Sequence, residues 1–434
     1  MTLADRLLSA LAPWRCAPAW RVAFSGGLDS TVLLHLLAEW RGNEALPPLS
    51  AIHVVHGLQA AAERWPAHCQ AVCEQWGIEL QTVPVTVDRN VASLEQAARM
   101  ARYDAFADIL RPDEILLTAQ HRDDQAETLL FRLLRGAGVR GLGGMPINRP
   151  LGAGRLVRPL LDISRAELEG YARHHDLRWV EDPSNSDTRF ARNFLRQKVM
   201  PQLAAHWPGA TGNLARSAAH LREADALLGE LADLDLVAAR ESPPWPWLPV
   251  PSLELEPLLA LPDARQRNAL RHWLAPLTLL PDSDHWAGWA CLRDAADDRA
   301  PRWRLETGEL RRSAGRLWWL SDAWLETPRL NAAYAGAEVE LPGNGRVGWQ
   351  GDLPPGELRL TYRQGGERLC LAGRGTRDLK RLLNESGLPP FVRERLPLLL
   401  RGDELLAVAN LPVLRAAEVQ GRLCWECPKT QPRV

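Results

Sequence analysis

A serine- and glycine-rich turn is the first stretch of the chain whose residues could do chemistry. The turn, Ser25–Ser30, reads Ser-Gly-Gly-Leu-Asp-Ser and follows an apolar run that ends at Phe24. Gly26 and Gly27 allow a tight bend that brings backbone N–H groups close to a ligand, and the following helix adds free amides and the positive end of its dipole. The Asp29 carboxylate could hold a metal ion beside a pyrophosphate. The turn predicts an anion-binding cradle, and a tight turn without a ligand is the plain alternative.

Residues 118–128 are the second candidate and the densest polar cluster in the chain. Asp123, Asp124 and Glu127 would fall within one helical turn, so two carboxylates can share a face. Such a group can hold Mg²⁺ or the ammonium group of an amine substrate. His121, or one of the carboxylates, could take the proton that an amine must lose before it attacks. An acid-rich first turn stabilised by the helix dipole is the alternative without chemistry.

Arginine supplies the third kind of candidate. The predicted helix from Ser93 to Leu110 places Glu95, Arg99 and Arg102 on one side. A surface ion-pair ladder is one interpretation of this pattern. The other is an arginine pair that faces a phosphate or a base edge, since a guanidinium fits both.

The positive charge is unevenly distributed, although the formal net charge is only −1. Residues 132–158 contain six arginines and residues 189–222 contain five arginines and one lysine, and neither stretch contains an acid. Residues 363–381 contain six basic and two acidic residues. A nearly neutral protein with such segregated stretches can bind a phosphate backbone, and arginines scattered over solvated faces are the alternative.

The elements that must position these residues alternate between strands and helices. Apolar runs predict four strands, at residues 21–24, 49–56, 78–87 and 114–119. Apolar periodicity and caps predict helices at residues 1–18, 30–40, 60–76, 93–110 and 123–135. This order predicts a doubly wound parallel α/β domain, in which ligands bind beyond the carboxyl ends of the strands. The turn after Phe24, His53 and His56, and the cluster at 121–127 all follow strand ends.

The rest of the chain divides into two further expected domains. The first domain is expected over residues 1–205. Residues 206–325 are rich in Ala, Leu, Trp and Arg, and helical periodicity over 215–239 and 265–274 predicts a helical domain. Residues 326–434 alternate short apolar runs with Gly and Pro, which predicts a small β-rich or α+β domain.

Composition indicates a cytoplasmic protein. No run of about 18 apolar residues predicts a membrane span, and the first residues do not form a secretory signal. Seven dispersed cysteines favour free thiols in a reducing compartment over a disulfide framework. The single Cys-x-x-Cys at Cys424 and Cys427 has no second pair at matching spacing, which makes a zinc site a weak prediction.

The turn at Ser25–Ser30 resembles the pyrophosphate loop of the N-type ATP pyrophosphatases. These enzymes use ATP to adenylate an oxygen atom and release pyrophosphate. A series of further motifs over about the first 200 residues closely resembles the bacterial tRNA(Ile)-lysidine synthetase family. In order, they are Ser25–Ser30, His53–His56, Glu95 with Arg99, Arg102 and Tyr103, Thr118–Thr128, Arg132–Gly138, Gly141–Met145, Arg158–Leu161, Glu181–Asn185 and Arg192–Arg196.

The resemblance implies an ATP-dependent ligase that joins free L-lysine to C2 of the wobble cytidine of isoleucine tRNA with a CAU anticodon. It implies Mg²⁺ at Asp29 and helical and C-terminal domains that hold the tRNA. The residues it implies for ATP are Ser25, Gly26, Gly27, Leu28, Asp29 and Ser30. The residues it implies for RNA are Arg99, Arg102, Arg192, Arg196, Arg374 and Lys380. The residues it implies for catalysis are Asp29, His121, Asp123, Asp124 and Glu127.

Two other functions stay open at this point. A related tRNA 2-thiolase would need a cysteine beside the site, and no cysteine lies between Cys73 and Cys291. A tRNA-binding protein without activity would be expected to have a damaged loop, and Ser25–Ser30 is intact. The sequence does not determine the oligomeric state, and a homodimer is among the alternatives.

Overall fold

The computed structural model describes residues 2–41, 46–55, 64–87, 94–241, 245–280, 286–296, 299–326 and 328–428. The chain forms two compact units, Met1–Ala226 and Leu227–Val434. None of the helices in the described part is long and apolar enough to cross a membrane.

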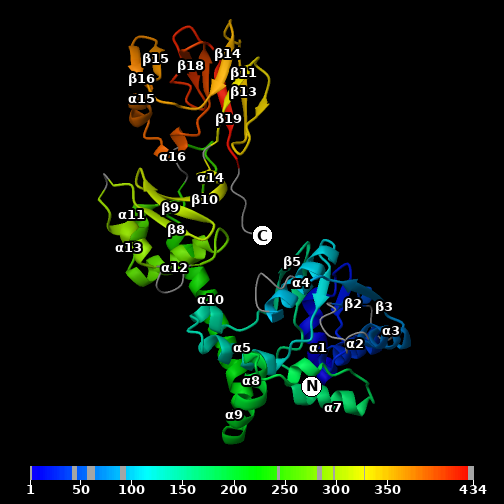
Figure 1. The fold of residues 1–434 in the computed structure, drawn as a ribbon. Helices are drawn as coiled ribbons and strands as arrows, with labels where there is room; N and C mark the ends of the chain where they lie inside the picture. The colour runs from blue at the N-terminus through cyan, green and yellow to red at the C-terminus, as the bar shows by residue number, and fades with distance from the viewer. Residues whose placement is uncertain are drawn as a thin grey trace. The chain divides into compact units, whose positions relative to one another are not determined.

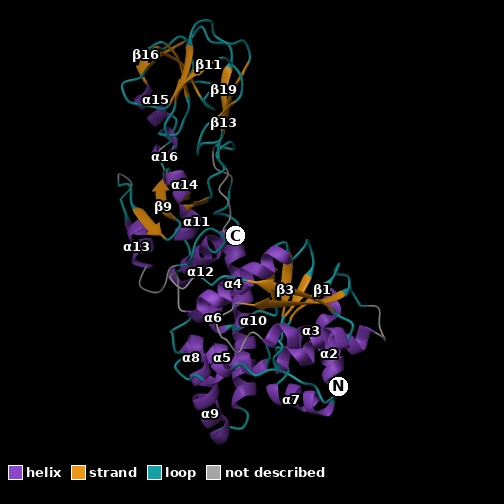
Figure 2. Ribbon diagram, turned by 45° about the vertical axis from the view of Figure 1, so that its right-hand side comes forward, coloured by secondary structure: helices purple, strands orange, loops and turns teal. Residues whose placement is uncertain are grey.

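A six-stranded sheet with the order β3-β2-β1-β4-β6-β5 forms the centre of the first unit. Neighbouring strands are parallel except β5, which pairs antiparallel with β6 at the edge. Helix α4 covers one face, and α2 and α3 cover the other (Figure 1, Figure 2). The strands are β1 (Trp20–Ala23), β2 (Leu49–Val55), β3 (Glu79–Pro84), β4 (Ile115–Leu117), β5 (Asn148–Leu151) and β6 (Gly154–Val157). This arrangement confirms the predicted doubly wound α/β fold.

Helices α1 to α5 of the first unit correspond to the five helices that the sequence predicts. The α-helices are α1 (Leu3–Leu11), α2 (Leu28–Arg41), α3 (Trp65–Gln75), α4 (Leu94–Ile109), α5 (Arg122–Leu133), α6 (Val139–Leu142), α7 (Arg165–His174), α8 (Ala191–Phe194) and α9 (Met200–His206). Short 3-10 turns lie at η1 (Ala12–Trp14) and η3 (Pro183–Ser186), and η4 (Leu195–Val199) is a π-helix. Helix α10 (Ala210–Leu236) runs across the boundary between the units. The expected N-cap at Ser93 and the strand-end residue His56 lie outside the described residues.

Apolar side chains bury both faces of the six-stranded sheet. All three residues of β4 are buried, as expected for a central parallel strand. One core cluster joins β1 and β4 to α1, α2, α3 and α7, and a second joins β2 and β6 to α4. The loops after β1 and β4 are thereby fixed on a rigid frame, and both carry the polar clusters found in the sequence.

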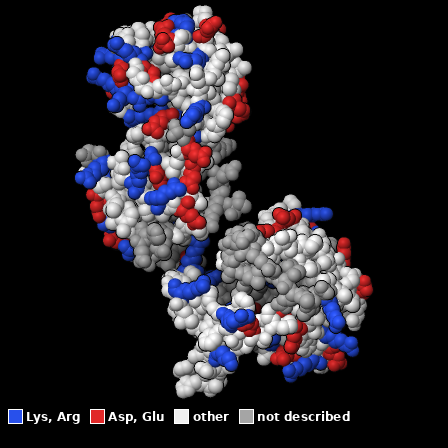
Figure 3. Space-filling model, in the orientation of Figure 1, with Lys and Arg blue, Asp and Glu red and all other residues white. Residues whose placement is uncertain are grey.

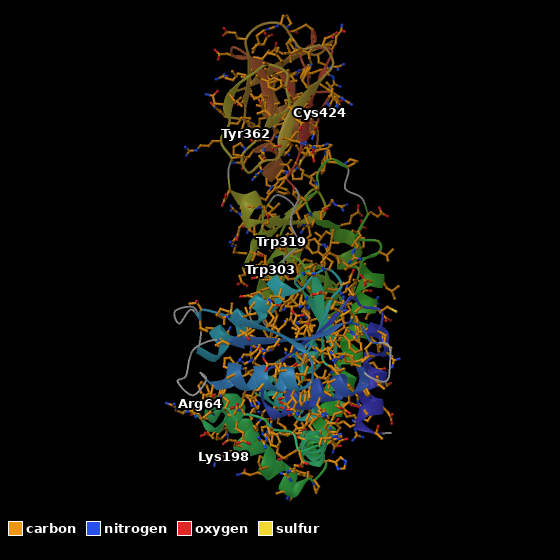
Figure 4. All side chains as sticks on the ribbon, turned by 90° about the vertical axis from the view of Figure 1, so that its right-hand side faces the viewer. Arg64, Lys198, Trp303, Trp319, Tyr362 and Cys424 are labelled. Carbon is orange, nitrogen blue, oxygen red and sulfur yellow. The ribbon has the colours of Figure 1, made fainter. Side chains whose placement is uncertain are left out.

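The second unit starts with helices packed on a four-stranded antiparallel sheet, β7-β10-β9-β8. Its elements are β7 (Ser252–Glu254), α11 (Leu255–Leu259), α12 (Asp263–Leu274), α13 (Ala287–Asp294), β8 (Arg302–Leu305), β9 (Gly308–Ser313), β10 (Arg316–Ser321) and α14 (Asp322–Leu325). Trp303 and Trp319 lie in its core (Figure 4). The sequence predicted only helices here. In β8 the side chains alternate between exposed and buried, with Trp303 and Leu305 inside, and this period of two is the signal that was missed.

The remainder of the second unit is the small β-rich domain that the sequence predicts. It contains sheets with the orders β11-β14-β17-β18, β12-β13-β19 and β15-β16. The strands are β11 (Asn331–Tyr334), β12 (Val339–Glu340), β13 (Arg346–Gln350), β14 (Leu358–Thr361), β15 (Arg368–Leu371), β16 (Gly375–Asp378), β17 (Leu398–Arg401), β18 (Glu404–Val408) and β19 (Arg422–Glu426). The helices are α15 (Leu379–Glu385) and α16 (Pro390–Arg393).

A buried arginine ties the segment after α14 to this domain. Arg395 is 3% exposed and donates to the carbonyl oxygens of Trp324 and Glu326, at 2.5 and 2.8 Å. Its Nε donates to the side-chain oxygen of Asn344 at 2.9 Å, and its guanidinium lies 4.8 Å from the ring of Trp324. No carboxylate is ion-paired with Arg395 within the described ranges. Burial lowers the pKa of Arg395, so its role here is structural.

We expect Arg395→Leu to lower the free energy of unfolding by about 3 kcal/mol or more, because several buried carbonyl groups lose their donor at once. Urea unfolding followed by tryptophan fluorescence would measure the change. Arg422→Leu is the matched control, because Arg422 is exposed on β19 and donates only to Gln350 among the recorded hydrogen bonds of the described residues. Equal losses of stability from the two substitutions would contradict the structural role that we assign to Arg395.

Candidate active site

The loop after β1 is shaped by its own hydroxyl groups. Ser25 Oγ lies 3.0 Å from Ser30 Oγ and accepts a hydrogen bond from the Gly27 N–H at 3.3 Å. The hydroxyls of Ser30 and Thr31 both donate to the Gly27 carbonyl, at 3.0 and 2.9 Å. The loop leads directly into α2, whose first turn has amides without acceptors inside the helix. The serines therefore hold the loop in a form that presents backbone N–H groups.

Gly26 occupies a position that only glycine fits. Its φ is +78°, and a Cβ there would lie 2.9 Å from Cys69 Sγ and 3.2 Å from Val180 Cγ2. Its carbonyl accepts a hydrogen bond from the Val180 N–H at 2.9 Å. A segment more than 150 residues later in the chain is thereby bound to the cradle.

His53 lies beneath the same loop at the end of β2. Its Nδ1 donates to the Phe24 carbonyl at 2.8 Å, and Cys69 Sγ lies 3.5 Å from the same nitrogen. Burial lowers the pKa of His53, although the bond to Phe24 opposes that effect. His53 therefore contributes a neutral ring that ties β2 to the end of β1.

His121 stands between the loop and the carboxylates of α5. The ring is 1% exposed, with Nε2 3.6 Å from Asp29 Oδ2 and 3.5 Å from Asp124 Oδ2. Its Nδ1 lies 3.6 Å from Asp123 Oδ2, which also accepts a hydrogen bond from the Arg165 N–H at 2.9 Å. Burial alone would lower the pKa of His121, but Asp123, Asp29 and Asp124 together raise it to about 10. His121 thus faces three carboxylates across 3.5–3.6 Å.

Asp124 and Glu127 are neutralised by two arginines from α8 and η4. Arg196 binds Glu127 in a bidentate pair at 2.7 and 2.9 Å and Asp124 at 2.8 Å. Arg192 reaches the same two carboxylates, at 3.3 Å for Glu127 and 3.1 Å for Asp124. Glu127 is 3% and Asp124 8% exposed. Burial raises the pKa of Asp124, but His121, Arg192 and Arg196 hold it below its ordinary value.

Asp29 has a carboxylate oxygen that is available to bind a metal ion. Its Oδ1 is buried and has no hydrogen-bond partner within the described residues. Those residues contain no group of three or more histidine, cysteine or acidic side chains arranged to hold a metal by themselves. Mg²⁺ at nucleotides is commonly held by one or two carboxylates together with phosphate oxygens. The donor at Asp29 fits that kind of site.

A cleft of about 970 Å³ lies over these residues. One wall carries Ser25, Asp29 and Ser30 from the loop, and α4 contributes Arg99 and Arg102. The segment bound to Gly26 also lines the cleft. Its lining residues include Val180, Glu181, Asp182, Asn185, Arg196 and Gln197. The cleft lies beyond the carboxyl ends of β1, β2 and β4, where the topology predicts a ligand.

The predicted RNA contacts fall in three places. Arg99 and Arg102 line the cleft, and Arg192 and Arg196 pair with its carboxylates. Arg374 and Lys380 lie in the second unit and are exposed. They belong to a basic patch over β15, β16 and α15 (Figure 3). The exposed members of this patch are Arg368, Arg374, Arg377, Lys380 and Arg381.

Sequence reasoning missed several contributors to the site. Glu181 was noted only as the start of the Glu181–Asn185 motif, and Val180 was not noted at all, because its contact with Gly26 has no local signal in the sequence. The pairing of Arg192 and Arg196 with α5 was also not predicted. Arg192 and Arg196 are four residues apart, and Asp124 and Glu127 are three apart, so each pair can share one face of a helix. These spacings are the signal that could have suggested the pairing.

The fold and the loop define the class of the first unit. Residues 1–203 match a family model described as a PP-loop domain. A solved structure, the U34-tRNA thiolase NcsA from Methanococcus maripaludis with its [4Fe-4S] cluster, is 18% identical with a TM-score of 0.42. That similarity covers 51% of this chain and 78% of that chain, and it is too weak to bear on function.

The particular family follows from the whole chain. Residues 253–318 match a TilS substrate binding domain, and residues 358–427 match a TilS substrate C-terminal domain. The chain is 61% identical to the tRNA(Ile)-lysidine synthase of Pseudomonas fluorescens, over 98% of this chain and 96% of that one. It is 62% identical to that of Pseudomonas aeruginosa, over 99% and 98%. The chain belongs to the tRNA(Ile)-lysidine synthase family.

We expect Arg196→Ala to lower the free energy of unfolding by about 2–3 kcal/mol, because two buried carboxylates lose their main partner while Arg192 still compensates part of their charge. Thermal and urea unfolding would measure the change. Arg189→Ala is the matched control. Arg189 also pairs with a carboxylate, Asp187, but its side chain is 90% exposed, so we expect its removal to leave the stability nearly unchanged. A comparable loss of stability in both variants would contradict the larger contribution that we assign to the ion pairs of Arg196.

Proposed function

We propose that this chain ligates free L-lysine to C2 of the wobble cytidine of isoleucine tRNA with a CAU anticodon, in a reaction driven by ATP. The observation that carries the proposal is the Ser25–Ser30 loop, folded as an anion cradle at the edge of a cleft with buried carboxylates. It occurs in a chain that matches tRNA(Ile)-lysidine synthases over nearly its full length. The product, lysidine, pairs with adenine, so codon reading changes from AUG to AUA.

The reaction would run in two steps. The O2 atom of cytidine attacks the α-phosphorus of ATP and pyrophosphate leaves. The ε-amine of lysine then attacks C2, AMP leaves with O2, and the amine loses a proton. Backbone amides of the loop and of the first turn of α2 would bind the phosphates and stabilise the charge that develops on the leaving pyrophosphate. The wobble base can leave its stack at low cost because it lies in a single-stranded loop.

We assign Mg²⁺ to Asp29, whose buried Oδ1 has no other recorded partner within the described part of the chain. The ion, when bound, would neutralise charge on the phosphates. His121 would act by holding Asp29 in place, because its Nε2 lies 3.6 Å from Asp29 Oδ2.

The carboxylates are the proposed site for the lysine ammonium group and for its proton. Asp123, Asp124 and Glu127 are the candidates from α5. Arginines already balance Asp124 and Glu127, which leaves Asp123 and Asp29 as the carboxylates nearest to His121 without an arginine ion pair among the described residues. Asp123 is the proposed acceptor of the proton, because it contacts His121 and keeps one oxygen away from the Arg165 amide, although it is not among the residues that line the cleft.

For the RNA, we propose contacts from Arg99 and Arg102 in the first unit and from Arg374 and Lys380 in the second. All four are arginines or lysines without a recorded carboxylate partner within the described ranges. Arg192 and Arg196 are already paired with buried acids, so we propose the other four residues as the RNA contacts.

The cysteines disfavour a thiolase. Cys69 is the cysteine nearest to the loop among the described residues, and burial raises its pKa to about 12. Burial likewise raises the pKa of Cys73 to about 11. Sulfur chemistry requires a thiolate, which neither residue provides near neutral pH. All seven cysteines are described and free, which supports a cytoplasmic location. A homodimer stays a prediction.

We expect Asp29→Ala to abolish tRNA-dependent release of pyrophosphate from ATP, a loss of at least about 100-fold, because it removes the proposed metal ligand at the cradle. Its affinity for the tRNA should stay within about twofold of wild type. A coupled pyrophosphate assay and filter binding would measure the two quantities. Asp108→Ala is the control, since Asp108 is exposed on α4 and does not line the cleft. Loss of tRNA binding with intact adenylation would contradict the role of Asp29.

A further inference from the structure

Four arginines gather around one tyrosine of α4. The guanidinium of Arg99 lies 4.9 Å from the centre of the Tyr103 ring, and its Nη2 donates to the phenol oxygen at 3.3 Å. The guanidinium of Arg149, on edge strand β5, lies 4.9 Å from the same ring centre. Arg158 and Arg102 lie within electrostatic reach of the same phenol. We call these five residues the Tyr103 cluster.

The described side chains include no acid that pairs with the arginines of the Tyr103 cluster, and the side chain of Glu95 lies outside them. No carboxylate is ion-paired with any of its four arginines within the residues that the structure describes. Arg158 is only 3% exposed, and its Nε is buried without a partner in that same part of the chain. Burial lowers the pKa of Arg102 and of Arg158. Charges buried in this way destabilise the fold, so their presence indicates an anionic partner.

The cluster is positioned to meet a ligand that enters the cleft. Arg99, Arg102 and Tyr103 line the cleft, whereas Arg149 belongs to β5 at the edge of the sheet and does not line it. The cluster therefore extends from the cleft to the outside of the domain. The loop that would hold the phosphates of ATP follows β1, at the centre of the same sheet.

The chemistry of the cluster favours a phosphate over a base. Two guanidinium groups already lie 4.9 Å from the centre of the Tyr103 ring, which makes the ring a poor platform for base stacking. Arginines match the oxygen atoms of a phosphate through paired N–H donors. The phenol oxygen accepts a hydrogen bond from Arg99 and so orients that guanidinium.

We propose that the Tyr103 cluster binds a backbone phosphate of the tRNA anticodon loop, next to the base that enters the cleft. This inference rests on the proposed function, because it takes an RNA loop as the substrate. A phosphate of ATP shares the same chemistry and is the other source that the experiments must separate. The contact positions the RNA and reads no base.

Arg149→Ala tests the site in the full-length protein, because Arg149 is only half-buried and lies outside the lining of the cleft. We expect its Kd for unmodified isoleucine tRNA with a CAU anticodon to rise about tenfold at 100 mM salt, the loss of about one charge-assisted contact. The slope of log K against log salt should become shallower by about 0.7. The Kd for ATP should stay within about twofold.

Arg173→Ala is the matched control. Arg173 is 73% exposed on α7 and pairs with Glu169 four residues before it. We expect neither its affinity for the tRNA nor its salt slope to change. Tyr103→Phe adds a second variant, which keeps the ring but loses the oxygen that accepts the hydrogen bond from Arg99. It should show a smaller loss in the same direction.

Neutral methylphosphonate linkages, placed one at a time in a synthetic anticodon stem-loop, would locate the phosphate. One position should weaken binding to wild type about tenfold and weaken binding to Arg149→Ala by no more than about twofold, because the contact is already lost. If every position weakens both proteins equally, Arg149 touches no loop phosphate and the proposal is overturned.

Two other outcomes would also overturn it. Weaker ATP binding with unchanged tRNA binding would assign the cluster to the nucleotide. Unchanged binding of both would mean that the cluster holds no anion. Failure of the proposed function is a separate result, since a wild-type protein that binds the loop through Arg149 but forms no lysidine would leave the phosphate site intact.

Discussion

The ion pairs between α5 and the segment from α8 to η4 are the constraint on which the rest of the site depends. Asp124 and Glu127 are almost fully buried, and each would be costly to ionise without Arg192 and Arg196. The network continues through His121 to Asp29 in the loop after β1. One connected set of charges thus fixes the helix that carries the acids and the loop that would receive ATP.

Backbone contacts from residues before α8 also fix the site. The Val180 amide binds the Gly26 carbonyl, and the Arg165 amide binds Asp123. The PP-loop domain is therefore more than a sheet with helices, since residues beyond 160 supply part of the lining of its cleft. Within η4 the backbone is a π-helix, a form found often at functional sites, and it carries Arg196. The geometry suits a reaction in which RNA, lysine and ATP meet in one enclosed space.

Much of the first unit could be predicted from the sequence, because its signals are local. The Ser-Gly-Gly turn, the apolar strands and the acid-rich start of α5 are each contained in a few neighbouring residues. The partners of Arg192 lie 65 and 68 residues earlier and could not be found from periodicity. The sheet β7-β10-β9-β8 was also missed, because its short strands are rich in the same Trp, Leu and Arg residues as the helices around it. Gly26 shows the limit well: its type predicted a turn, but only the fold shows that Cys69 and Val180 exclude any other side chain.

Incorporation of radiolabelled L-lysine into unmodified isoleucine tRNA with a CAU anticodon tests the central claim most directly. The assay would compare reactions with and without ATP, with the methionine tRNA that bears the same anticodon as the control. Labelling of the isoleucine tRNA alone, only in the presence of ATP, is the predicted result. Absence of labelling while the tRNA still stimulates release of pyrophosphate would contradict the account, because adenylation would then serve a nucleophile other than lysine.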